Sequence, residues 1–138
     1  MSPVYETDPW GGVDQDAFLN ATVLADDPAL DARGWLRRAQ ELERVAERVR
    51  DQRWGPRTLD VDLVMCSDGG REVTSDDDEL TLPHPLARER AFVLVPWLAV
   101  DPAAVLTVAG ERRSVEKLLA ELDSAERDGV RMTGLVLG

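Results

Sequence analysis

Residues 58–65 constrain the fold of this chain more than any other stretch, because aliphatic and acidic side chains alternate along them. In an extended strand, successive side chains point to opposite faces. The alternation therefore predicts a strand over residues 58–65, with Leu59, Val61 and Leu63 on one face. Asp60 and Asp62 would then point together from the other face.

A shared carboxylate face is suited to binding divalent metal ions. Hard cations such as Mg²⁺ prefer oxygen ligands, and a metal pair can clamp both ends of a phosphoryl transfer. Between Arg44 and Arg57 lie five arginines and only two acidic residues, in a chain whose net charge is −11. This basic segment favours a small anionic ligand such as a phosphate group. The alternatives are an amphipathic strand with a solvated acidic face and a salt-bridged helix end.

Length and composition limit the class of protein. A chain of 138 residues, 43% hydrophobic and 31% charged, is typical of one soluble globular domain. The strongly negative charge argues against nucleic-acid binding. Cys66 is the only cysteine, which excludes a disulfide framework and a thiol-based metal site. No apolar run is long enough to span a membrane and no signal peptide opens the chain, so we expect a cytoplasmic protein.

The remaining sequence predicts an α+β fold. Strands are expected at residues 3–7, 18–25, 80–82 and 105–108, and helices at 31–49, capped by Asp31, and 114–122, capped by Ser114. Residues 91–100 fit a strand or a helix, and 67–78 fit an exposed hairpin or loop. The core is expected to contain Leu19, Ala21, Val23 and Ala25 of the second strand, and Trp35, Ala39, Leu42 and Ala46 of the first helix.

Several motifs occur in the order typical of one enzyme family. They are Tyr5-Glu-Thr-Asp-Pro9, Phe18-Leu-Asn20-Ala, Gln40-Glu-Leu-Glu43, Arg53-Trp-Gly-Pro-Arg-Thr-Leu-Asp-Val-Asp62, Leu82-Pro-His-Pro85 and Arg90-Ala-Phe92-Val-Leu-Val-Pro96. On these motifs, residues 2–102 closely resemble the 6-hydroxymethyl-7,8-dihydropterin pyrophosphokinase family. The resemblance implies one ferredoxin-like domain over residues 1–138. It also implies transfer of the terminal diphosphate of ATP to the pterin hydroxymethyl group, with release of AMP, in folate biosynthesis.

The resemblance also implies a role for each matching residue. Asp60 and Asp62 would hold two Mg²⁺ ions, and Arg48 and Arg57 would stabilise charge on the transferred group. ATP would be bound by Gln40, Glu43, His84 and Arg90, and the pterin by Thr7, Pro9, Trp10, Phe18, Asn20 and Phe92. Arg53 and Trp54 would belong to a loop that closes over the substrates.

The start of the chain departs from the family pattern. The family normally opens with a strand, a glycine-serine-asparagine turn and a helix, and none of these precedes Pro3. In such a sheet the first strand is central, so we expect its absence to expose strand edges. One hypothesis is that residues 130–137 take its place, in the same chain or in a neighbour. We expect a monomer, in which this gap would also allow strand exchange.

The sequence leaves two alternatives to an active pyrophosphokinase. One, suggested by the missing strand, is a catalytically incompetent fragment that still binds nucleotide or pterin or serves as an assembly partner. The other is a different metal-dependent phosphotransferase that uses the same acidic pair. The combination of Phe18 and Asn20, which suits a planar heterocycle, speaks against the latter.

Overall fold

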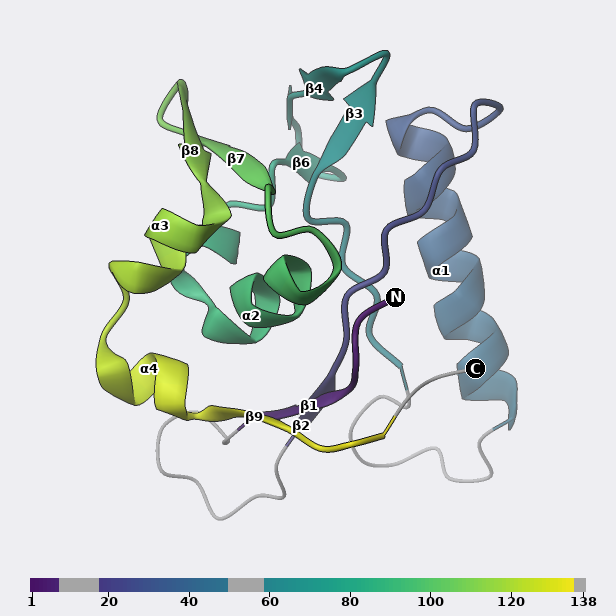
Figure 1. Ribbon diagram of the computed structural model, residues 1–138. Helices are drawn as coiled ribbons and strands as arrows, with labels where there is room; N and C mark the ends of the chain where they lie inside the picture. Colours follow the sequence, from purple (N-terminus) through teal and green to yellow (C-terminus); the bar gives the residue numbers. More distant parts are fainter. Residues whose placement is uncertain (8–17, 50–58, 136–138) are drawn as a thin grey trace. The chain divides into compact units, whose positions relative to one another are not determined.

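The computed structural model describes residues 1–7, 18–49 and 59–135, apart from the side chains of 48 and 49 (Figure 1). Within these ranges, helices pack with short antiparallel strands, which confirms the predicted α+β class. The chain divides into two compact units. The first unit combines Met1–Asp26 with Leu86–Gly138, and the second is the continuous segment Asp27–Pro85.

A three-stranded antiparallel sheet lies in the first unit. It consists of β1 (Tyr5–Thr7), β2 (Phe18–Asn20) and β9 (Val130–Met132), in the order β2-β1-β9. The predicted strand near the N-terminus is therefore confirmed. The C-terminal tail joins the sheet that carries Asn20, but it pairs with β1 and not with β2. The outer edge of β2 has no partner strand among the described residues.

The second strand is shorter than the sequence predicts. It ends at Asn20, and residues 21–26 have no regular structure. Leu19 and Val23, expected in the core, are 60% and 59% exposed, and Ala25 is exposed as well. The expectation was wrong because alternation alone does not make a strand. Inter-strand hydrogen bonds are also needed, and in the described residues only β1 pairs with β2.

Helix α2 (Ala91–Val100) forms the centre of the first unit. It contacts all three strands of the sheet, the 3₁₀ helix η2 (Ala87–Glu89) and the helices α3 (Val115–Ala120) and α4 (Ser124–Asp128) (Figure 1). These contacts explain why an almost uniformly apolar segment is helical, since a helix that is apolar on all sides must be buried. The most deeply buried large side chains are Leu94, Leu106 and Val115.

The predicted strand at residues 105–108 and the predicted helix capped by Ser114 are both present in this unit. Strands β7 (Val105–Val108) and β8 (Glu111–Ser114) form a hairpin whose two turn residues, Ala109 and Gly110, both have positive φ. Positive φ at both turn positions suits the twist of a two-residue hairpin. The Ser114 hydroxyl accepts a 3.0 Å hydrogen bond from the Lys117 amide, which confirms the predicted cap of α3.

The second unit begins with helix α1 (Ala32–Val49). The Gly34 amide donates a 2.7 Å hydrogen bond to Asp31 Oδ1, which confirms the predicted cap. Ala39 is buried and Trp35 and Ala46 are half-buried, as expected, but Leu42 is 41% exposed. The expectation for Leu42 was wrong because helical spacing places a residue near the apolar face without fixing how far that face is covered.

Two hairpins complete the second unit. β3 (Cys66–Asp68) pairs with β4 (Arg71–Val73) through a Gly69-Gly70 turn, and β5 (Ser75–Asp76) pairs with β6 (Thr81–Leu82). The predicted exposed hairpin at residues 67–78 and the short strand near Leu82 are thereby confirmed.

The acidic segment does not form the predicted strand. Thr58 lies outside the described residues, and residues 59–65 have no regular structure before β3 begins at Cys66. In the described residues this segment pairs with no strand, although the His84 amide donates a 2.8 Å hydrogen bond to the Val64 carbonyl. The alternation is visible in burial only from Asp60 to Leu63, because Asp60 and Asp62 are exposed whereas Val61 and Leu63 are half-buried. Leu59, expected on the same face as Val61, is 40% exposed.

Candidate functional site

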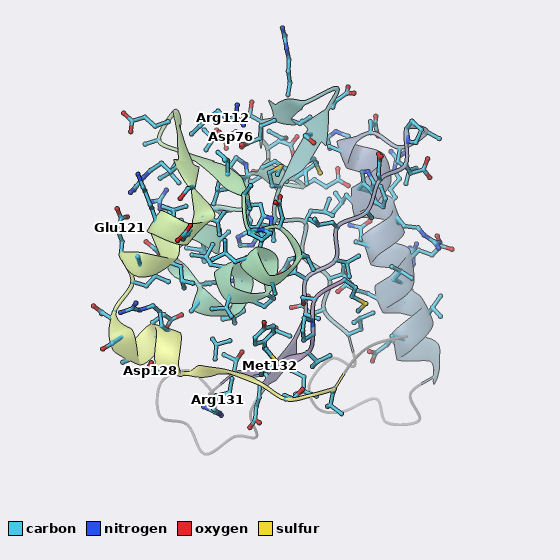
Figure 2. All side chains as sticks on the ribbon, in the orientation of Figure 1. Asp76, Arg112, Glu121, Asp128, Arg131 and Met132 are labelled. Carbon is cyan, nitrogen blue, oxygen red and sulfur yellow. The ribbon has the colours of Figure 1, made fainter. Side chains whose placement is uncertain are left out.

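Strands β1 and β2 bring three of the predicted pterin-binding residues together. Thr7 lies directly opposite Phe18, and Tyr5 opposite Asn20, so these four side chains share one face of the sheet. Glu6, on the other face, pairs with Arg131 at 3.5 Å. Figure 2 shows Arg131 on the side of the sheet away from α2, so the face that carries Thr7 and Asn20 is the one that α2 covers.

The side chain of Asn20 is oriented by a neighbouring hydroxyl. Asn20 Nδ2 donates a 3.0 Å hydrogen bond to Thr7 Oγ1, and Thr7 is only 7% exposed. This bond occupies one of the two amide hydrogens and leaves the other, together with Oδ1, for a further partner. Phe18, at the same edge, is 48% exposed. A carboxamide with a donor and an acceptor beside an accessible aromatic ring can bind a flat heterocycle.

Arg90 and Phe92 lie at the start of α2. Arg90 is the N-cap residue, and its guanidinium carbon lies 5.5 Å from the centre of the Phe92 ring. A guanidinium at this distance over an aromatic face makes a favourable cation–π contact. Both side chains are half-buried. The contact fixes the predicted phosphate-binding arginine and the predicted stacking ring relative to each other.

Asp60 and Asp62 have the chemistry that a magnesium site requires. Both carboxylates are exposed and are separated by one residue. In the described residues, no group of three or more histidine, cysteine or acidic side chains could hold a metal ion. This donor set fits Mg²⁺ that is bound together with a substrate, because protein-bound Mg²⁺ commonly has one or two carboxylate ligands and takes the others from phosphates and water.

The other predicted nucleotide-binding residues are also in the second unit. Gln40 is exposed and Glu43 half-buried, three residues apart on α1, and His84 is half-buried after β6. Arg48 is in the last turn of α1. Five predicted site residues lie outside the described residues: Pro9, Trp10, Arg53, Trp54 and Arg57.

One finding about the site was not predicted. The Thr7 side chain, and not only its backbone, contributes by accepting the Asn20 hydrogen bond. The signal was the equal spacing of Tyr5 and Thr7 on one strand and Phe18 and Asn20 on the next, which makes Thr7 and Asn20 diagonal neighbours. Outside the site, burial raises the pKa of the half-buried Cys66 thiol, which disfavours its thiolate form.

Comparison with known proteins identifies the family. The family model for 7,8-dihydro-6-hydroxymethylpterin-pyrophosphokinase matches residues 1–102. The chain is 62% identical over 136 residues to a 2-amino-4-hydroxy-6-hydroxymethyldihydropteridine pyrophosphokinase of Mycobacterium tuberculosis, covering 95% of this chain and 72% of that protein. A protein of the same name from Mycobacterium leprae is 60% identical, and the match covers 99% of this chain and 75% of that protein. One from Bacillus subtilis is 40% identical, and the match covers 96% of this chain and 69% of that protein.

These matches agree with the sequence motifs and extend beyond them. The mycobacterial relatives align over nearly the whole chain, including residues after 102 that the family model does not match. In the described residues, no helix is both long and apolar enough to cross a membrane. The chain belongs to the 7,8-dihydro-6-hydroxymethylpterin-pyrophosphokinase family, as its motifs predicted.

Proposed function

We propose that this chain transfers the diphosphate of ATP to the hydroxymethyl group of 6-hydroxymethyl-7,8-dihydropterin, a step of folate biosynthesis in the cytoplasm. The observation that carries this proposal is the family match over residues 1–102, with relatives of that name at 62% identity. In the reaction, the hydroxyl oxygen of the pterin attacks the β-phosphorus of ATP. The bond between that phosphorus and the oxygen that links it to the α-phosphorus breaks, AMP leaves with that oxygen, and the hydroxyl proton is released to water.

In this proposal the pterin binds to the first unit. Asn20 offers a donor and an acceptor to the edge of the heterocycle, and its hydrogen bond to Thr7 fixes which atoms face the ligand. Phe18 and Phe92 stack on the two faces of the ring, which adds roughly 0.5 to 1.5 kcal/mol to the burial of apolar surface. Pro9 and Trp10 complete this wall of the site.

ATP and the metal are assigned mainly to the second unit. Asp60 and Asp62 would hold two Mg²⁺ ions, which when bound supply positive charge to the triphosphate. Gln40 and Glu43 seat the nucleotide, and His84 contacts its phosphates. Arg90, in the first unit, also binds a phosphate, since a guanidinium forms paired hydrogen bonds with phosphate oxygens.

Three arginines and a tryptophan act on the transferred group. Arg48 and Arg57 stabilise its negative charge in the transition state. Arg53 and Trp54 belong to a loop that closes over both substrates and excludes water from the reactive phosphate.

We propose a single ferredoxin-like domain that is monomeric. In the described parts of the chain, the outer edge of β2 has no partner strand, and Leu19 and Val23 are exposed. The same observation favours a second candidate function, a fragment that binds pterin or nucleotide without catalysis. An exposed strand edge also allows strand exchange with another copy.

Asp62→Ala tests the proposed chemistry. Because Asp62 is exposed, the variant should fold normally, yet diphosphate transfer should be lost, as measured by formation of AMP and the pterin diphosphate. Asp68→Ala removes an exposed carboxylate from β3 in the same unit and should leave transfer unchanged. Substantial transfer by Asp62→Ala would contradict the assignment. A wild-type chain that binds the pterin in calorimetry but forms no AMP would favour the binding fragment.

A further inference from the structure

The start of α2 is held by a residue from far along the chain. The Ala91 amide donates a 3.2 Å hydrogen bond to Glu126 Oε1, from α4, 35 residues later. Ala91 is fully buried. The N-cap residue Arg90 makes no capping hydrogen bond with its side chain, and the first turn of α2 contains no acidic residue. Glu126 therefore supplies both the acceptor and the negative charge that the start of a helix favours.

Glu126 also connects α2 to the sheet. Two residues after Glu126, α4 ends at Asp128, and β9 begins at Val130. Val130 lies directly opposite Thr7 on β1, and Thr7 lies opposite Phe18 on its other side. Five consecutive residues, 126–130, thus contact both the start of α2 and the end of the sheet that carries Thr7 and Phe18 (Figure 1).

The residues on either side of Ala91 are the ones assigned to the substrates. Arg90 and Phe92 lie on either side of Ala91, whose amide donates the hydrogen bond to Glu126. They also contact each other, with the Arg90 guanidinium carbon 5.5 Å from the centre of the Phe92 ring. If the Ala91 amide lost its acceptor, a buried donor would be left unsatisfied. The first turn of α2 would then shift or unwind, and Phe92 would move relative to Phe18.

We propose that Glu126 is a positioning residue for the pterin site, although it lies outside the residues 1–102 that the family model matches. It holds the turn that carries Arg90 and Phe92 against the sheet edge that carries Thr7 and Phe18. This inference rests on the proposed function, because it takes the pterin to bind between Phe18 and Phe92.

Glu126→Ala, Glu126→Gln and the control Glu121→Ala test the inference. Glu121 lies at the outer edge of the same unit, just after α3, and forms an exposed ion pair with Arg113 (Figure 2). We expect Glu126→Ala to raise the KM for the pterin about 3- to 30-fold, with kcat changed much less, in line with the loss of a helix cap. Glu126→Gln keeps an acceptor oxygen and should restore most of the affinity, and Glu121→Ala should match the wild type.

Amide hydrogen exchange provides a readout that needs no substrate. Exchange at Ala91 and Phe92, followed by NMR on the ligand-free chain, should accelerate in Glu126→Ala and not in Glu121→Ala. Unchanged exchange at Ala91, or a pterin KM equal to that of the wild type, would overturn the inference. So would a Glu126→Gln variant as impaired as Glu126→Ala. A wild-type chain that does not bind the pterin would instead refute the proposed function, and the exchange data would still report on Glu126.

Discussion

The hydrogen bond between Asn20 and Thr7 allows a quantitative test of how the chain would recognise its pterin. The bond is 3.0 Å long and its acceptor, Thr7, is 7% exposed. Thr7→Val replaces the hydroxyl by a methyl group of nearly the same shape. The Asn20 carboxamide then remains but is no longer oriented by Thr7.

The two single substitutions should differ in magnitude. Losing one neutral hydrogen bond costs about 0.5 to 1.5 kcal/mol, so Thr7→Val should weaken pterin binding about 2- to 12-fold. Asn20→Ala removes the group that faces the ligand and leaves polar atoms of the bound heterocycle unpaired. That loss costs about 1 to 3 kcal/mol, or about 5- to 150-fold in affinity.

Calorimetry with the pterin, Mg²⁺ and an unreactive ATP analogue would measure these effects. In the double variant Thr7→Val/Asn20→Ala, the Thr7 substitution should have almost no further effect, because its role is to orient Asn20. Thr133→Val is the matched control: Thr133 Oγ1 donates a 2.7 Å hydrogen bond to the Val4 carbonyl, next to β9. Additive effects of the two substitutions, or an equal loss of affinity in Thr133→Val, would refute the proposed role of Thr7.

Two further predictions concern stability and association. Hydrogen bonds from the Leu80 amide, the larger cause, and from Arg33 lower the pKa of the Asp77 carboxyl. The ionised carboxylate therefore stabilises the fold fully above the ordinary aspartate pKa of about 3.9. This stabilisation is lost as the pH falls through the lowered pKa. In urea unfolding, Asp77→Asn should therefore flatten the acid limb of the stability profile, whereas Asp78→Asn should not; equal slopes would contradict this. Leu19→Lys should reduce any concentration-dependent association of the chain in sedimentation velocity. A charge on β2, whose outer edge has no partner among the described residues, opposes pairing with a strand of another copy. Unchanged association would exclude this edge as the contact between copies.

Elements with local signals could be predicted from the sequence. Helix α1 has an aspartate cap and an apolar face with helical spacing, and Asp31 caps it as expected. Ser114 likewise begins α3. In both cases the decisive hydrogen bond joins residues three positions apart, so the sequence contains both partners within one turn. The family itself was also predicted correctly, because its motifs are short stretches of sequence that can be recognised without knowing the fold.

Features that depend on distant partners could not be predicted in the same way. Residues 18–25 and 58–65 alternate as strands do, yet only Phe18–Asn20 is a strand in the described parts of these stretches, because a strand also needs a neighbour. The pairing of β9 with β1 joins residues more than a hundred positions apart. The contact of Glu126 with the Ala91 amide has no local signal at all, since a glutamate in a short polar helix is usually only solvated.

The pairing of β1 with β9 imposes an order of events on folding. Tyr5–Thr7 can acquire its second neighbour only after Met132 has left the ribosome, whereas every residue of the continuous unit Asp27–Pro85 has been synthesised well before then. Until then, β1 can pair with β2 but not with β9. Translation thus produces β9 long after the two other strands of this sheet, β1 and β2.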